Sequence, residues 1–156
     1  MSVKQEPNNY GRLSTGGKAL TAKEYLMQVR TLDALINAKQ TELYGLKLNA
    51  TSISSPQITE KVQSNGENSV MRIVDKIVDL QNEINAEIDE LIDLKTEIRE
   101  KIAKVYNKEF ITLLTDKYIN GLTLEQIAER MNKSYVTICS WHGEALNIFR
   151  AENNMK

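Results

Sequence analysis

The sequence is poor in the residues that carry most catalytic and metal-binding chemistry: it has one Cys, one His and one Trp among 156 residues. A single cysteine excludes an internal disulfide and gives no metal-ligand spacing. No stretch approaches the roughly 20 apolar residues of a membrane span, and the polar N-terminus lacks the apolar core of a signal peptide. We therefore expect a soluble, cytoplasmic protein with no membrane association.

Helix-breaking and aromatic residues are also scarce, with two Pro, seven Gly and 6% aromatics. Leu, Ile, Glu and Lys are abundant instead, which favours an all-α chain of one domain or two small ones. The net charge of −1 excludes a protein that binds nucleic acid by bulk positive charge. Residues 69–106 carry most of the acidic excess, whereas residues 107–156 hold six basic and six acidic side chains.

The beginning of the chain combines Pro, Asn, Gly and Ser with few large apolar residues. We interpret residues 1–20 as a flexible arm. Thr21 then provides an N-cap, and Glu24 three positions later completes a capping box. Apolar residues recur every three or four positions after this cap, which predicts a helix over residues 22–48.

The clearest periodicity in the sequence lies in residues 69–106. Its apolar positions are Ile73, Ile77, Leu80, Ile84, Ile88, Leu91, Ile98, Ile102 and Val105. We expect this helix to pack against residues 22–48 as an antiparallel hairpin over residues 21–106, joined by a polar linker at 49–68. Pairing of the same apolar stripe with a second copy, which would give a homodimer, remains an alternative.

Residues 107–156 restart the period as three shorter helices. Thr123 caps the second of them, with Gln126 as its capping-box partner. Asn132 follows at a position that favours a left-handed turn residue, and Ser134 caps the last helix. A short helix, a tight turn and a further helix are typical of a helix-turn-helix DNA-binding unit.

The last helix has one apolar face and one mixed face. The inner, apolar positions are Ile138, His142, Ala145 and Phe149. We expect His142 to be a hydrogen-bonded core residue, and Trp141 to be either half-buried at the bundle edge or exposed as an anchor for a partner. No side chain in this unit has the surroundings of a metal ligand or a general base.

The mixed face supplies the candidate DNA contacts, because N-terminal residues of this helix reach base edges in docked helix-turn-helix proteins. The candidates for base contact are Tyr135, Val136, Cys139, Ser140 and Gly143. The candidates for phosphate contact are Arg130, Lys133 and Ser134. Because Gly143 weakens a helix by about 1 kcal/mol relative to Ala, its presence indicates close approach to a backbone or another helix.

The C-terminal unit resembles, over NGLTLEQIAERMNKSYVTICSWHGEAL, the helix-turn-helix of region 4 of the sigma-70-type transcription factors. Together with TAKEYLMQVRTLDALINAK and IVDLQNEINAEIDELIDL, this segment is similar, over roughly residues 21–150, to a phage-encoded family from Gram-positive hosts. That family is largely of unknown function and is similar to phage late-gene transcriptional activators. The resemblance implies sequence-specific binding to double-stranded DNA, transcription regulation in the host cell, and host RNA polymerase as a partner.

Two other functions stay open. The last helix contains no Lys or Arg from Ser134 to Phe149, which favours a protein-interaction module that uses the helix-turn-helix and the coiled helices. A phage DNA-packaging or assembly subunit would also join a helix-turn-helix to oligomerising helices. An enzyme is not expected, because the sequence shows no nucleophile–base pair, metal cluster or complete nucleotide loop, and no cofactor is implied.

Overall fold

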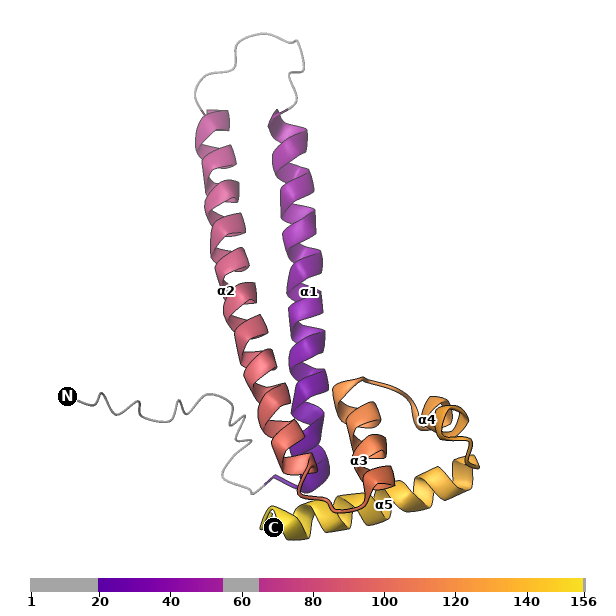
Figure 1. Ribbon diagram of the computed structural model, residues 1–156. Helices are drawn as coiled ribbons and strands as arrows, with labels where there is room; N and C mark the ends of the chain where they lie inside the picture. The colour runs from indigo at the N-terminus through magenta and orange to yellow at the C-terminus, as the bar shows by residue number, and fades with distance from the viewer. Residues whose placement is uncertain (1–19, 55–64, 156) are drawn as a thin grey trace, which may run out of the picture. The chain divides into compact units, whose positions relative to one another are not determined.

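The computed structural model describes residues 20–54 and 65–155, and every regular element in these ranges is helical (Figure 1). The prediction of an all-α chain is confirmed. The elements are α1 (Ala22–Ser54), α2 (Asn65–Ile102), α3 (Lys108–Leu114), the π-helical turn η1 (Thr115–Ile119), α4 (Leu124–Met131) and α5 (Tyr135–Glu152). Within the described ranges, none of these helices combines the length and apolarity needed to cross a membrane. The expected arm, apart from its last residue, lies outside the described residues.

The two long helices extend into the segment 49–68, for which the sequence predicts a polar linker. α1 ends only at Ser54 and α2 already begins at Asn65, so both ends of the expected linker are helical. Residues 49–55 contain no glycine, and the first proline of this segment is Pro56. Nothing in these residues therefore breaks α1 before Ser54. The middle of the expected linker, residues 55–64, lies outside the described residues.

The chain forms two compact units, and both long helices contribute to each of them. Among the described residues, the core unit comprises 20–31 and 90–155, and the two-helix unit comprises 32–54 and 65–89. The periodicity of the sequence predicts a boundary after residue 106 instead. The start of α1 and the end of α2 therefore belong to the same compact unit as the C-terminal helices.

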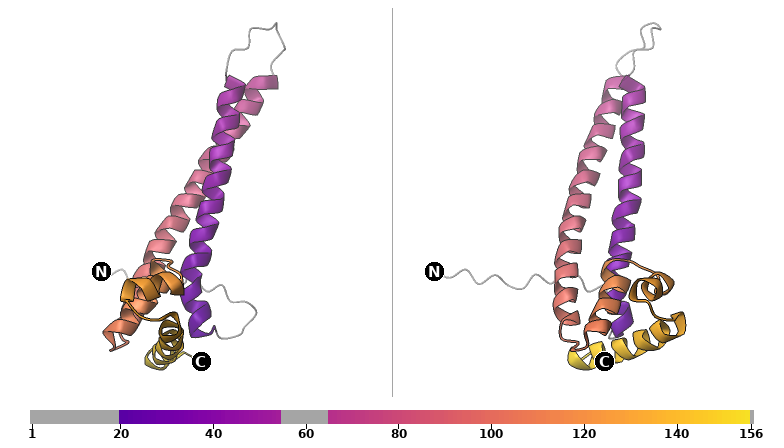
Figure 2. Two further views of the ribbon diagram at one scale, coloured as in Figure 1. Left: turned by 90° about the vertical axis from the view of Figure 1, so that its right-hand side faces the viewer. Right: turned by 45° about the vertical axis from the view of Figure 1, so that its right-hand side comes forward.

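In the two-helix unit, α1 and α2 lie side by side and run in opposite directions (Figures 1 and 2). The buried apolar side chains of this unit are Ile36, Leu43 and Ile84. Lys39 interrupts the apolar pattern of α1, and its Nζ forms ion pairs with Glu83 at 3.1 Å and with Glu87 at 2.5 Å. Hydrogen bonds to Glu87 and Glu83 raise the pKa of Lys39. The gap in the apolar stripe is therefore a polar cross-link between the helices.

The core unit is built around side chains that every one of its helices contributes. Its largest fully buried side chains are Leu26, Val29, Ile98, Ile102, Val105, Leu113, Leu114, Tyr118, Ile127, Ile138 and Phe149. Tyr25 of α1 stacks on Phe149 of α5 with ring centroids 6.4 Å apart, and its hydroxyl donates to Oε1 of Glu97 at 2.6 Å. Lys101 Nζ donates to the same hydroxyl at 2.7 Å, which ties the start of α1 to the end of α2.

Candidate nucleic-acid interface

Three local caps define the segment that joins α4 to α5. Thr123 and Gln126 form the predicted capping box, in which Gln126 N donates to Thr123 Oγ1 at 3.2 Å and Thr123 N donates to Gln126 Oε1 at 2.9 Å. Asn132 has the predicted left-handed conformation, with φ 51° and ψ 48°. Ser134 Oγ accepts from Thr137 N at 3.1 Å and caps α5. All three local predictions are confirmed.

α4 and α5 contact each other, and each helix buries one of its faces. The buried residues of the two helices are Ile127, Ala128, Ile138, Ala145 and Phe149. The turn is closed by the backbone, because Lys133 N donates to the carbonyl oxygen of Ala128 at 2.9 Å. Since the inner face of α5 is fully packed, the orientation of its outer face is fixed.

The outer face of the first half of α5 is open to solvent. Val136 is 77% exposed and Tyr135 is 48% exposed, and Ser140 and Gly143 are exposed as well. Cys139 is half-buried. The candidates for base contact therefore form one exposed strip, with Cys139 at its more buried edge.

Within the described part of the chain, the expected close approach to Gly143 is not found. A Cβ atom built at this position meets no described atom within 4 Å apart from its chain neighbours and the adjacent backbone of α5. The small residues of α4 and α5 that are buried are Ala128 and Ala145. Gly143 therefore leaves a small gap in the outer surface of α5, and packing within the chain does not account for it.

Arg130 is not an unpaired surface cation. Its Nη1 donates to Oδ1 of Asp116 at 3.0 Å, and Asn120 Nδ2 donates to the same oxygen at 2.8 Å. Asp116 is 2% exposed, while the Arg130 side chain is 59% exposed. Asp116 Oδ2 is buried and finds no hydrogen-bond partner in the described part of the chain. Arg130 therefore compensates a buried carboxylate first, and offers only its remaining N–H groups to a ligand.

Two basic side chains of α1 lie close enough to Lys117 of η1 for their charges to act on it. Partial burial, and then the positive charges of Arg30 and Lys23, lower the pKa of Lys117 in η1. The charges of Lys117 and Lys23 also help to lower the pKa of His142 in α5, after burial. We call Lys23, Arg30 and Lys117 the basic cluster.

Lys133 and Trp141 lie together at the turn. The Lys133 Nζ lies 5.3 Å from the centroid of the Trp141 ring, within the range of a cation–π contact. Trp141 is half-buried and meets the ring of Phe110 edge-on, with centroids 5.9 Å apart. Of the two interpretations of Trp141, the half-buried position at the bundle edge is confirmed.

His142 is a hydrogen-bonded inner residue, as the sequence predicts. Its Nε2 lies 2.8 Å from the Tyr118 hydroxyl, and the two rings stack with centroids 5.8 Å apart. Burial raises the pKa of Tyr118 to about 12, and burial is also the first cause of the lowered pKa of His142. The pair is therefore uncharged at neutral pH.

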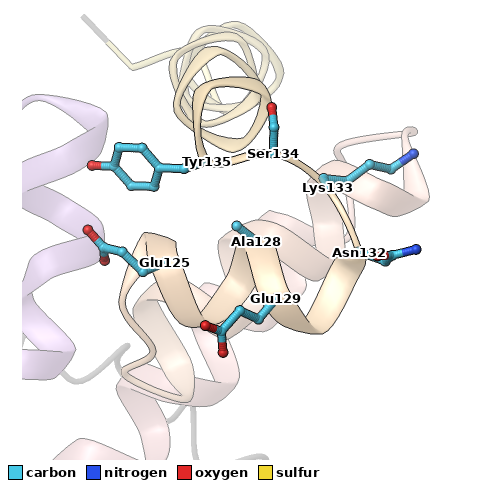
Figure 3. A pocket seen from close by; sticks show the side chains of 7 residues that line it. All are labelled: Glu125, Ala128, Glu129, Asn132, Lys133, Ser134 and Tyr135. Carbon is cyan, nitrogen blue, oxygen red and sulfur yellow. The ribbon is translucent and has the colours of Figure 1, made fainter.

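A shallow hollow of about 510 Å³ lies along the α4–turn–α5 segment (Figure 3). Tyr135 and Glu125 lie at one end of it, and Asn132 and Lys133 lie at the other. A hydrogen bond with Cys139, followed by the charges of Cys139 and Glu125, raises the pKa of Tyr135. The hollow thus has the Glu125 carboxylate and the Tyr135 hydroxyl at one end and the Lys133 ammonium group at the other.

Metal-site chemistry is not found in the part of the chain that the structure describes, since no group of three or more His, Cys, Asp or Glu side chains could hold an ion. Two features of the site are missed by reasoning from sequence: Asp116 and the basic cluster. Asp116 follows the buried residues Leu113 and Leu114 within a largely apolar run. An acidic residue in such a run is the sequence feature that could have indicated a buried, paired carboxylate. The basic cluster left no such signal, because its members are up to about 90 residues apart along the chain.

A family described as "Protein of unknown function (DUF1492)" matches residues 52–149, and the chain belongs to this family. The matched residues include all of the candidate DNA contacts. No curated protein and no solved structure matches the chain.

Proposed function

We propose that this member of the DUF1492 family binds double-stranded DNA sequence-specifically, with α4, the turn and α5 as a helix-turn-helix. The observation that carries the proposal is the outer face of the first half of α5. The same helix that buries Ile138 and Ala145 completely leaves Val136 77% exposed. In docked helix-turn-helix proteins, this part of the second helix enters the major groove.

The exposed strip offers the groups that major-groove recognition uses. The hydroxyls of Tyr135 and Ser140 donate to or accept from base edges, and the Val136 methyl groups pack against a thymine methyl. Because Gly143 has no side chain, the groove wall approaches the helix backbone there. The strip therefore selects bases through short polar and apolar contacts rather than through Arg–guanine pairs.

Phosphate contacts come from basic residues outside the recognition strip. The basic cluster contributes Lys23, Arg30 and Lys117, and Lys133 contributes from the turn. Burial is the first cause of the lowered pKa of Lys117, and the charges of Arg30 and Lys23 add to it. A phosphate bound beside these cations would relieve their mutual repulsion. Phosphate contacts position such a protein on the duplex, while base contacts specify the site.

Transcription regulation is the proposed biological role, and its support is the sequence resemblance to region 4 of the sigma-70-type factors. In that setting the chain is an activator encoded by a phage, and it acts with host RNA polymerase in the host cytoplasm. The neutral charge balance of residues 107–156 agrees with a protein that gains affinity from a second DNA-bound partner.

A second candidate function is favoured by the composition of α5. The helix carries no Lys or Arg before Arg150, and its most exposed residue in the first turn is the apolar Val136. A protein-interaction module would present such a surface to a partner protein rather than to DNA.

Selection from a random double-stranded DNA library, followed by affinity measurements at several salt concentrations, separates the two functions. The DNA-binding proposal predicts an enriched sequence motif. It also predicts a log–log salt slope of about −3 to −4, as expected for four phosphate contacts. Absence of an enriched motif, or binding that does not weaken with salt, would contradict it and favour the interaction module.

A further inference from the structure

Glu125, in the first turn of α4, lies beside the exposed strip of α5. Its side chain is exposed, and it lines the hollow together with Tyr135, the first residue of α5. Figure 3 shows both side chains at one end of the hollow, projecting toward the same side. Because Tyr135 is a candidate for base contact, Glu125 lies at the edge of the surface that faces bases in the proposed complex.

Glu125 also lies close to the basic cluster. Its charge acts on Lys117, and the charge of Lys117 acts on Glu125 in return. Among the residues that the structure describes, neither of these two side chains forms a direct ion pair. The carboxylate of Glu125 therefore lies near both the phosphate-contacting and the base-contacting side chains of the proposed interface.

The carboxylate is ionised at neutral pH. Hydrogen bonds from its own backbone N–H and from the Thr123 hydroxyl lower the pKa of Glu125, and the positive charge of Lys117 adds to the effect. An ionised carboxylate accepts hydrogen bonds and donates none, and it has about four acceptor positions. Acceptor positions therefore remain for a ligand after the bonds within the chain are made.

Double-stranded DNA offers few donors to such a group. A carboxylate beside the DNA backbone meets the like charge of the phosphates, which costs affinity. In the major groove the donors are the amino groups of cytosine and adenine, and a Glu side chain pairs with cytosine N4. Adenine suits a carboxylate less well, because its N7 acceptor lies beside the amino group. The cost of Glu125 is therefore compensated where a cytosine amino group reaches it.

We propose that Glu125 is a specificity-determining residue of the DNA interface, and that it accepts a hydrogen bond from the amino group of a cytosine at the edge of the target site. At sites without this cytosine, the carboxylate repels the phosphates that the basic cluster contacts, and the complex is weakened. The inference rests on the proposed function, because it assigns one base pair of the target site to one side chain.

The test replaces the carboxylate by the neutral amide of the same shape. Glu125→Gln keeps an acceptor and gains a donor, which together match the N6 and N7 atoms of adenine. Selection from a random double-stranded DNA library should therefore give a motif in which one C·G pair of the wild-type motif is replaced by A·T. The other positions of the motif should be unchanged. Binding to an unrelated duplex should be about 5- to 10-fold tighter than for the wild-type chain, since the repulsion of phosphates is removed.

Glu129→Gln is the matched control. Glu129 lines the same hollow one turn further along α4, away from the end that holds Tyr135. The substitution removes the same charge from the same helix, and its motif and its affinity for the unrelated duplex should match those of the wild-type chain. Circular dichroism should show equal helicity in all three proteins.

The outcomes separate this inference from the proposed function. If the Glu125→Gln motif keeps every C·G pair of the wild-type motif, or if both variants change in the same way, the inference is overturned and the DNA-binding proposal stands. A wild-type motif that contains no C·G pair has the same consequence. A wild-type chain that enriches no motif overturns the proposed function and this inference together.

Discussion

Arg130 of α4 donates to the buried carboxylate of Asp116 in η1, with Nη1 and Oδ1 3.0 Å apart. The carboxylate is 3% exposed and the guanidinium side chain is 59% exposed, so the pair connects the interior of the core unit to its surface. Four further N–H groups of the guanidinium remain after this one is engaged. One arginine therefore anchors the first helix of the proposed helix-turn-helix and still presents donors to a phosphate.

Removing this arginine should destabilise the fold. Arg130→Leu leaves the Asp116 carboxylate buried and uncompensated, and we expect a loss of about 2–3 kcal/mol in the free energy of unfolding. The expected value is below that of a fully buried pair because the guanidinium is partly exposed. Urea unfolding measures the change, and Arg150→Leu, at the exposed end of α5, is the control with a loss below about 0.5 kcal/mol. Equal losses in the two variants would contradict an anchoring role.

Neutralising Lys117 should change the salt dependence of DNA binding. If the basic cluster contacts phosphates, Lys117→Gln removes about one contact and makes the log–log salt slope shallower by about 1. The variant should lower affinity for all DNA sequences to a similar degree, since phosphate contacts carry no sequence information. Lys104→Gln, which removes an exposed cation outside the cluster, serves as the control. An unchanged slope in Lys117→Gln would exclude the cluster from the interface.

The His142–Tyr118 pair should make stability depend on pH. Burial, with the charges of Lys117 and Lys23, lowers the pKa of His142 in the folded chain below its usual value of about 6.5. The unfolded chain therefore binds the proton more readily, so this contribution to stability is complete above about pH 6.5 and is lost as pH falls through the lower folded pKa. We expect His142→Gln to show a flatter pH dependence of its urea midpoint than the wild-type chain. Parallel pH profiles would contradict a lowered pKa.

Gly143→Ala should separate stability from DNA affinity. Because an added Cβ meets nothing within 4 Å, the substitution should stabilise α5 by about 0.5–1 kcal/mol. If the groove wall approaches the backbone at Gly143, the same methyl group should weaken specific DNA binding. Thermal unfolding and binding to the selected DNA site measure the two effects. Lower stability, or unchanged affinity together with higher stability, would remove Gly143 from the proposed interface.

Local sequence signals predicted the local structure of the α4–turn–α5 segment. The capping box at Thr123, the left-handed Asn132 and the cap at Ser134 depend on neighbours within three residues, so the sequence alone contains the necessary information. The ends of the long helices were predicted less well. A polar composition does not by itself end a helix, and residues 46–54 contain no Gly or Pro, so α1 continues to Ser54.

Long-range features could not be predicted from the sequence. The gap in the apolar pattern at Lys39 became a cross-link only because Glu83 and Glu87 lie opposite it in the folded unit. The partnership of Arg130 with Asp116 likewise depends on how η1 meets α4. Each feature pairs side chains more than ten positions apart, where periodicity gives no information on which charges meet.

The central claim is that the outer face of α5 enters the major groove, and a paired substitution on α5 tests it most directly. Ser140→Glu places a carboxylate in the exposed strip, whereas Asn147→Glu places the same charge on an exposed position about 10 Å further along the helix. With both variants fully helical, affinity for the selected DNA site should fall at least about 100-fold in Ser140→Glu and less than about 5-fold in Asn147→Glu. Unchanged affinity in Ser140→Glu, or equal losses in the two variants, would contradict the account.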